Sequence, residues 1–310
     1  MSMALNAFDK KQIQEQIRAE KDIDALLRSL AEQLKKDIQK KYKDDEQVKS
    51  LDALVAAFAV SITKFWDEIE SVIYERSGNV ADVTIAKNKQ LFLDYMKKVK
   101  KAAVTEAQKK QVVKITDKAV KEFDYYKQRN QNITEARKVF DDKTIGQRIK
   151  IVKGATKKTV QNIVAVGVEK GKSAREIAKD IDGYVNPIKG NYRSPFDYYR
   201  QRFDKKVISQ SVKKAGYVRE GSVSYQAQRI ARTEINMTQR EVTKRLYKKV
   251  PFVKGYNWNL SKSHPDLGCE CERLSKTNPH KDVPDTPHPN CMCYVTTDLV
   301  DPKTFLKTLK

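Results

Sequence analysis

Apolar residues recur every three or four positions through the first part of the chain. Two such stripes run Ile13, Ile17, Ile23, Leu27, Leu30, Leu34, Ile38 and Leu51, Leu54, Phe58, Ile62, Phe65, Ile69, Ile73. This spacing places apolar side chains on one face of a helix. Helix breakers are rare here, because all nine prolines lie from Pro187 onward and Gly78 is the one glycine before Thr144. We therefore expect long amphipathic helices that pack together as a bundle.

The pattern changes after Thr144. Ser173 and Glu176 form a capping-box pattern that predicts a short helix ending near Gly183. A loop is expected over 187–195, a long helix over 224–249 and a strand over 252–260, with a second strand over 291–297. These changes in composition and residue pattern divide the chain into an N-terminal helical region (1–143), a central basic helical region (144–222) and a C-terminal module (223–310).

The net positive charge of the chain indicates which kind of partner it binds. The 310 residues contain 62 Lys and Arg and 40 Asp and Glu, a net charge of +22. Residues 201–254 carry +10 and residues 255–310 carry zero. This imbalance favours a polyanionic partner, and we expect weak, non-specific binding to double-stranded DNA. No motif that reads bases is present, and a solvated helix face is the plainer alternative. One stretch rich in lysine could contact phosphates; it consists of Lys97, Lys98, Lys100, Lys101, Lys109, Lys110, Lys114, Lys118 and Lys121.

A membrane location is not expected. The longest apolar run, 53–60, is too short to span a bilayer, and the N-terminal residues contain no apolar signal-peptide core. Secretion by that route is disfavoured for the same reason.

All four cysteines and all three histidines lie between His264 and Cys293. Residues two apart in a strand face the same side, so Cys291 and Cys293 would share one site, and Cys269 and Cys271 would do so if extended. Four soft ligands suit tetrahedral Zn²⁺, and His288 is close enough in sequence to replace one thiolate. The expected fold is thus mainly α: a helical body with a small C-terminal α+β module pinned by a Cys/His metal site.

Three interpretations of the cluster remain open. A structural zinc ion would supply folding energy to a module with little core of its own. Disulfides would suit an oxidising compartment. The third covers reduced cysteines or a catalytic metal, for which Asp266 could act as base, although no His-Glu-x-x-His pattern is present.

Several of these residues together resemble a known family. Arg229-Ile230-Ala231-Arg232-Thr233-Glu234 is followed by Trp258, Asp266, the Cys269/Cys271 pair and His288-Pro289-Asn290-Cys291-Met292-Cys293. Their order and spacing resemble the phage head morphogenesis family of Mu F-like minor head proteins. The resemblance covers roughly residues 144–297 and departs in its Cys-x-Cys pair, which family members commonly space as Cys-x-x-Cys.

The resemblance implies a minor capsid protein rather than an enzyme. Such a protein would reside in the virion head, and in the host cytoplasm during assembly, with the portal protein and capsid or scaffold proteins as partners. Arg232 and Glu234 would then be structural, one of them making a buried ion pair onto the cysteine module, with Trp258 and Asp266 also structural. The alternatives are an HNH-type zinc nuclease, which the neutral charge of 255–310 disfavours, and an ADP-ribosyltransferase-like toxin, which lacks a Gly-rich nucleotide loop.

Overall fold

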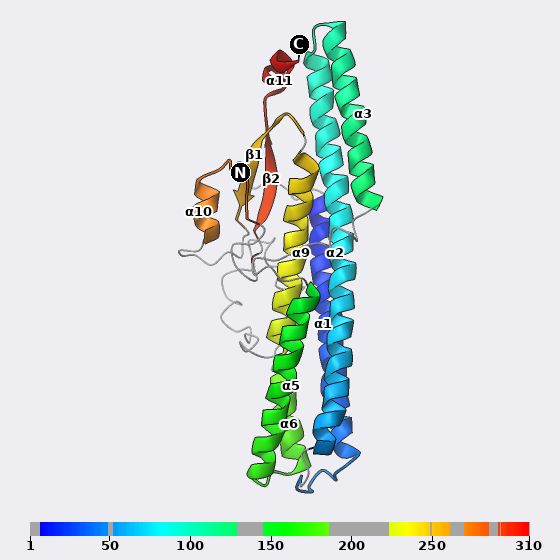
Figure 1. Ribbon diagram of the computed structural model, residues 1–310, viewed down its shortest axis with the longest axis vertical. Helices are drawn as coiled ribbons and strands as arrows, with labels where there is room; N and C mark the ends of the chain where they lie inside the picture. The colour runs from blue at the N-terminus through cyan, green and yellow to red at the C-terminus, as the bar shows by residue number, and fades with distance from the viewer. Residues whose placement is uncertain are drawn as a thin grey trace, which may run out of the picture. The chain divides into compact units, whose positions relative to one another are not determined.

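The computed structural model describes residues 7–48, 52–128, 145–185, 223–248, 250–260, 270–284, 291 and 293–309. Within these ranges the fold is mainly α, as predicted, with eight helices and one two-stranded antiparallel sheet near the C-terminus (Figure 1). The expected domain boundaries at 143/144 and 222/223 adjoin residues outside these ranges and stay predictions.

The chain divides into two compact units. The cysteine unit comprises Met1–Gln16, Tyr74–Asp142 and Arg232–Lys310, and the helical unit comprises Ile17–Ile73 and Lys143–Ala231. The limits of these units fall inside three helices: α1 (Ala7–Gln39), α2 (Asp52–Ala102) and α9 (Val223–Tyr247).

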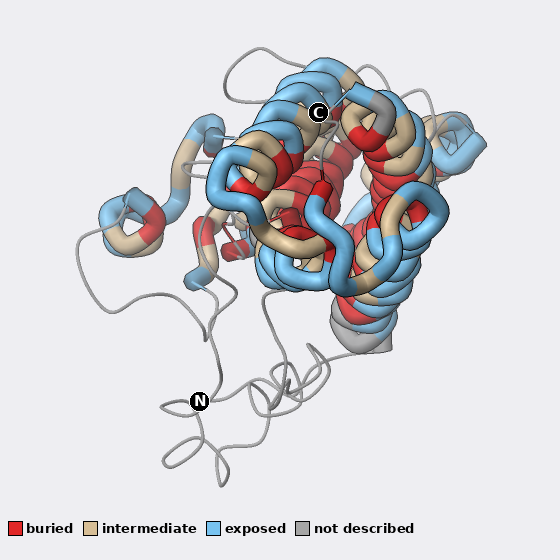
Figure 2. Tube along the Cα trace, turned by 90° about the horizontal axis from the view of Figure 1, so that it is seen from below, coloured by how far each residue is buried: buried red, intermediate tan, exposed pale blue. Residues whose placement is uncertain are grey.

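The helical unit buries both predicted apolar stripes. Every described member of the two stripes is buried, from Ile17 to Ile38 on α1 and from Leu54 to Ile73 on α2. Figure 2 shows these buried positions recurring along the helices between exposed ones, which is the pattern of an amphipathic helix. The side chain of Ile13 and all of Leu51 lie outside the described residues.

Two further helices complete the helical unit, α5 (Ile145–Glu169) and α6 (Ala174–Val185). They approach closely at Gly167, where an added Cβ would lie 2.6 Å from Cγ1 of Ile177. The predicted capping box is confirmed at the start of α6: the backbone N–H of Ser173 donates to Glu176 Oε2 over 2.8 Å, and the N–H of Glu176 donates to Ser173 Oγ over 3.3 Å.

In the cysteine unit, α2 and α3 (Glu106–Gln128) form a helical hairpin (Figure 1). The rings of Phe92 and Phe123 lie 5.5 Å apart between the two helices, and Lys89 pairs with Asp124 over 2.7 Å. The predicted lysine stretch lies on this hairpin and is exposed apart from the partly buried Lys109.

The sheet pairs β1 (Val253–Asn259) with β2 (Tyr294–Leu299), and Trp258 lies opposite Val295. Two strands alone are marginal in water. Helix α9 supplies the missing cover, since Gln239 Nε2 on α9 donates to the carbonyl of Val295 over 3.2 Å. Of two short helices, α10 (Glu270–Lys276) lies between the two strands in the sequence and α11 (Pro302–Thr308) follows β2.

The sheet shares one hydrophobic core with the helical hairpin. Phe252, which precedes β1, is fully buried with its ring 4.5 Å from Tyr95 and 5.6 Å from Phe92 of α2, and 5.0 Å from Phe305 of α11. The hydroxyl of Tyr95 also donates to the carbonyl of Val300 over 2.8 Å. The sheet and α11 are therefore packed against α2 and α3 in one hydrophobic core that is rich in aromatic side chains.

Candidate metal centre

Three buried thiols meet beside the sheet. The Sγ atoms of Cys271, Cys291 and Cys293 all lie within 4.8 Å of one another, and those of Cys271 and Cys291 are 3.4 Å apart. Zinc–thiolate bonds are about 2.3 Å long, so thiolates around a tetrahedral ion lie about 3.8 Å apart. The Cys271–Cys291 separation of 3.4 Å and the 4.8 Å limit on all three pairs are compatible with that value. The three described cysteines are free rather than disulfide-bonded, and their donor set fits a thiophilic metal ion.

The elements that supply the thiols differ from the expectation. Cys271 lies in the first turn of α10, so the extended conformation in which Cys269 and Cys271 would share a face does not apply to Cys271. Local pairs favour the helix: Glu270 contacts Arg273, and Glu272 contacts Lys276 over 2.6 Å. The acidic residues also lie in the first turn, where the helix dipole favours them.

The second predicted strand is also shorter than expected. It begins at Tyr294, after both cysteines, rather than at Cys291. The reason lies in the backbone carbonyls of Cys291 and Cys293, which accept hydrogen bonds from the side chain of Arg240 at 3.2 and 2.6 Å. The two thiols still reach one site, as predicted, but from an irregular segment.

Arg240 is the residue that sequence reasoning missed. Its side chain is fully buried on α9, donates to Cys291 Sγ over 3.1 Å, and places its guanidinium 4.9 Å from the centroid of the Trp258 ring. A signal was available in the sequence, because Arg240 lies three residues after Met237, within the spacing of three or four residues that places side chains on one helix face.

The thiols share protons unequally. The hydrogen bond with Cys271 lowers the pKa of Cys291, with a further contribution from the nearby Arg240 guanidinium. The same contact raises the pKa of Cys271. Cys291 is thus stabilised as a thiolate, which is the form that binds metal ions.

The remaining candidate residues between His264 and Cys293 have different outcomes. Cys269, His288 and Asp266, like His264, lie outside the described residues, so their places in the site stay predictions. His280 makes contacts outside the cysteine cluster. Its Nε2 is 2.7 Å from the carbonyl oxygen of Leu274, and its backbone pairs with that of Tyr256 on β1.

The structure shows the burial and backbone contacts of Arg232 and Glu234, the two residues of α9 that were predicted to be structural. Glu234 is fully buried and Arg232 partly so, and their carbonyls accept hydrogen bonds from Thr238 and Asn236. The ion pair expected between one of them and the cysteine module stays a prediction. Trp258 is fully buried on β1 beside Arg240.

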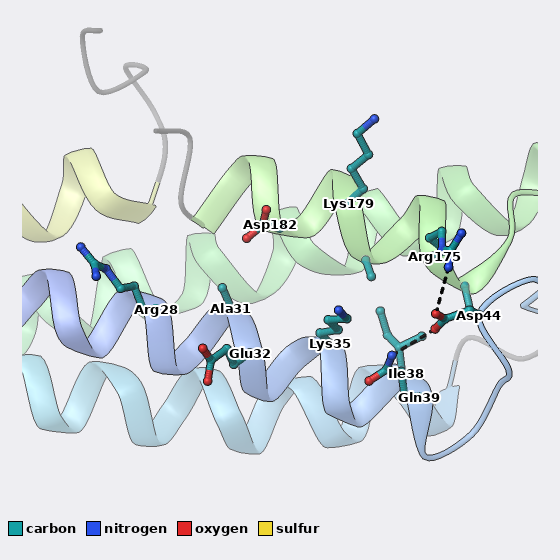
Figure 3. A pocket seen from close by; sticks show the side chains of 12 residues that line it. Arg28, Ala31, Glu32, Lys35, Ile38, Gln39, Asp44, Arg175, Lys179 and Asp182 are labelled. Atoms are coloured by element: carbon teal, nitrogen blue, oxygen red, sulfur yellow. Dashed lines mark hydrogen bonds and ion pairs between the residues drawn. The ribbon is translucent and has the colours of Figure 1, made fainter. Parts of the chain in front are cut away.

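A separate groove of about 390 Å³ lies between α1 and α6 in the helical unit (Figure 3). Its lining contains charged groups of both signs, and Arg175 pairs with Asp44 over 3.4 Å. Lys179 extends away from the other labelled side chains (Figure 3). This mixture of charges indicates neither an anion site nor a cation site.

Comparison with known proteins finds no counterpart: no protein-family model, curated protein or solved structure matches the chain. None of the helices in the described ranges is both long and apolar enough to cross a membrane.

Proposed function

We propose that the cysteine unit holds one structural Zn²⁺ ion through Cys271, Cys291 and Cys293, with a fourth ligand from Cys269 or His288. The observation that carries this proposal is the meeting of three buried thiols, none more than 2% exposed, around one point. Structural zinc sites are closed to solvent, whereas catalytic sites keep an open position. When bound, the ion supplies a cross-link between α10 and the segment before β2, and with it folding energy.

Residues around the three cysteines hold them in position for a metal ion. Cys271 is placed by α10, and the segment with Cys291 and Cys293 is held by the carbonyl hydrogen bonds from Arg240. The ring of Trp258 covers the guanidinium and helps to exclude water. A module with so few strands gains stability from a metal because its own core is small.

At the level of biology, we propose that the chain is a minor head protein of a tailed phage or prophage, which acts by binding rather than by catalysis. The support is the series of motifs from Arg232-Thr233-Glu234 to the Cys291/Cys293 pair, whose order and spacing resemble the Mu F-like family. The proposed partners are the portal protein and capsid or scaffold proteins. The test is cryo-electron microscopy of proheads purified with and without this protein, and density near the portal that disappears with the protein is expected.

Enzymatic alternatives are separated by direct assays. Plasmid cleavage in the presence of Mg²⁺ would indicate an HNH-type nuclease, and transfer of label from NAD would indicate an ADP-ribosyltransferase. We expect neither activity, because the proposed role needs only binding.

We further propose that exposed lysines of the α2–α3 hairpin contact DNA phosphates. Lys110, Lys114, Lys118 and Lys121 follow one another on α3 at spacings of four, four and three residues, and all are exposed. This spacing places them along one face of the helix. Each phosphate contact contributes about −0.9 to the slope of log K against log salt concentration.

Matched variants of the full chain test this proposal. Replacing the four α3 lysines by Gln should reduce the magnitude of the slope of log K against log salt concentration by up to about 3–4. The control replaces Lys35, Lys36, Lys41 and Lys43, four exposed lysines of the helical unit, and should leave it unchanged. Equal effects of the two sets would show that binding follows net charge alone.

A further inference from the structure

A polar recess of about 680 Å³ lies in the cysteine unit, lined by the end of α9, the start of β1 and residues 281–282. Cationic side chains outnumber anionic ones in its lining. The charged members are Lys244, Arg245, Lys248, Lys254, Lys281, Glu241 and Asp282. None of the described lining residues comes from α2 or α3, so the recess is distinct from the α3 lysines proposed above to contact DNA.

Hydrogen bonds between the three segments fix the walls of the recess. The backbone N–H groups of Tyr256 and His280 each donate to the carbonyl of the other residue over 2.8 Å. Gly255 permits this approach, because an added Cβ would lie 2.6 Å from the carbonyl oxygen of His280. Nζ of Lys244 on α9 donates to the carbonyl of Val283 over 3.0 Å. The segment that follows His280 is therefore held against both β1 and α9.

Both carboxylates of the lining lie beside a cation. Asp282 Oδ1 is 3.3 Å from Nζ of Lys244, and Glu241 pairs with Arg245 one turn further along α9. Each carboxylate therefore has its negative charge offset locally, which reduces its repulsion of an incoming anion.

Three exposed lysines, Lys248, Lys254 and Lys281, provide the other positive charges of the lining and are called the recess lysines below. Lys248 and Lys281 form no ion pair with a residue in the described part of the chain. Lys254 lies 3.5 Å from Asp298, and 63% of its side chain is exposed. Exposed ion pairs contribute little, so an anionic ligand can compete for Lys254.

The end of α9 would by itself repel an anion, because the last carbonyls of a helix carry partial negative charge. Two of these carbonyls are covered by donors. The hydroxyl of Tyr256 donates to the carbonyl of Lys244 over 3.3 Å, and the N–H of Val250 donates to that of Tyr247 over 3.1 Å. The ammonium groups of the lining therefore face less opposition from the helix end.

We propose that this recess binds phosphate groups, and that the recess lysines contact the phosphate oxygens. Lysine binds phosphate as a point charge, which suits side chains that converge from separate segments. The same chemistry accepts the backbone phosphates of duplex DNA or a free polyphosphate, and the tests below separate these two sources. The inference does not depend on the metal centre.

The first test replaces all three recess lysines by Gln in the full chain. For duplex DNA, the magnitude of the slope of log K against log salt concentration should fall by up to about 2–3 if DNA is the source of the phosphates. For inorganic pyrophosphate, binding measured by calorimetry should weaken by at least about tenfold if the source is a free polyphosphate. The control replaces three exposed lysines of the same unit that do not line the recess: Lys276, Lys303 and Lys307.

A larger effect of the recess set than of the control set on either ligand supports the proposal and identifies the source. Equal effects of the two sets on both ligands would overturn it. Replacement of the α3 lysines should leave pyrophosphate binding unchanged, so this proposal and the α3 proposal fail separately.

The second test changes the recess charge in the opposite direction. Asp282→Asn removes a negative charge from the lining and should strengthen binding of the same ligand by up to about fivefold. The side chain of Asp282 is 76% exposed, so the substitution should leave folding intact. Binding that is unchanged or weaker in Asp282→Asn would contradict a phosphate site at this place.

Discussion

Replacing Phe252 by alanine should destabilise the cysteine unit more than any ordinary surface change. The ring is fully buried and contacts Phe92 and Tyr95 of α2 and Phe305 of α11. Its backbone carbonyl also accepts from the N–H of Val300 over 2.9 Å, so the ring lies where the sheet, α2 and α11 meet. The substitution would leave a cavity between these elements.

The size of the effect can be worked from these contacts. Truncation of a buried phenylalanine costs about 3–5 kcal/mol, since the lost transfer free energy and the cavity both contribute. The three ring contacts place Phe252 in the upper part of this range, because aromatic pairs contribute about 0.5–1.5 kcal/mol beyond the area that they bury. We therefore expect a loss of about 4–5 kcal/mol in the free energy of unfolding, a large fraction of the 5–15 kcal/mol typical of a folded domain.

The two tryptophans give a local assay, because Trp258 lies in the cysteine unit and Trp66 in the helical unit. In a Trp66→Phe background, Trp258 fluorescence follows urea unfolding of the cysteine unit alone. Val104→Ala is the control, since Val104 is 88% exposed and its loss should cost under about 0.5 kcal/mol. A Phe252→Ala loss below about 1.5 kcal/mol would refute the shared aromatic core.

Further predictions concern the strand β1 and the start of α6. Gly255→Ala should cost about 1–3 kcal/mol in the Trp258 assay, because its Cβ would lie 2.6 Å from the carbonyl oxygen of His280 and push β1 away. Ser173→Ala should cost about 1 kcal/mol, read from Trp66 fluorescence in a Trp258→Phe background, through loss of the helix cap. The backbone N–H and hydroxyl of Ser173 lower the pKa of Glu176 below its usual 4.5, so this carboxylate stabilises the fold above about pH 4.5 and less as the pH falls below it. Glu176→Gln should therefore flatten the acid dependence of unfolding, and an unchanged acid limb would contradict this.

The helices could be predicted because their determinants are local. The stripes from Ile17 to Ile38 and from Leu54 to Ile73 are periodic over many turns, and each described member is buried. The start of α6 follows from Ser173 and Glu176 alone. A similar signal precedes α11, where Asp301 caps the helix by accepting from the N–H groups of Lys303 and Thr304, and Pro302 takes the first turn. That helix could have been predicted from the same rules.

The candidate metal centre could be predicted only in part. Clustering in the sequence identified Cys271, Cys291 and Cys293, because these residues lie within 23 positions of one another in the chain. The helical position of Cys271 was not predicted, because the sequence analysis considered only what an extended Cys-x-Cys segment would do. Arg240 was missed because its partners lie 51 and 53 residues further along the chain. The contact of Phe252 with α2 is similarly remote in sequence, and periodicity carries no information about such contacts.

The most direct test of the central claim is the metal content of the purified full chain. Elemental analysis of protein prepared without chelator, combined with titration of reactive thiols under denaturing conditions, should find about one zinc ion per chain and four reduced cysteines. Cys291→Ser is the control and should lose most of the zinc. A folded wild-type chain that contains no metal, or whose cysteines are paired in disulfides, would contradict the account.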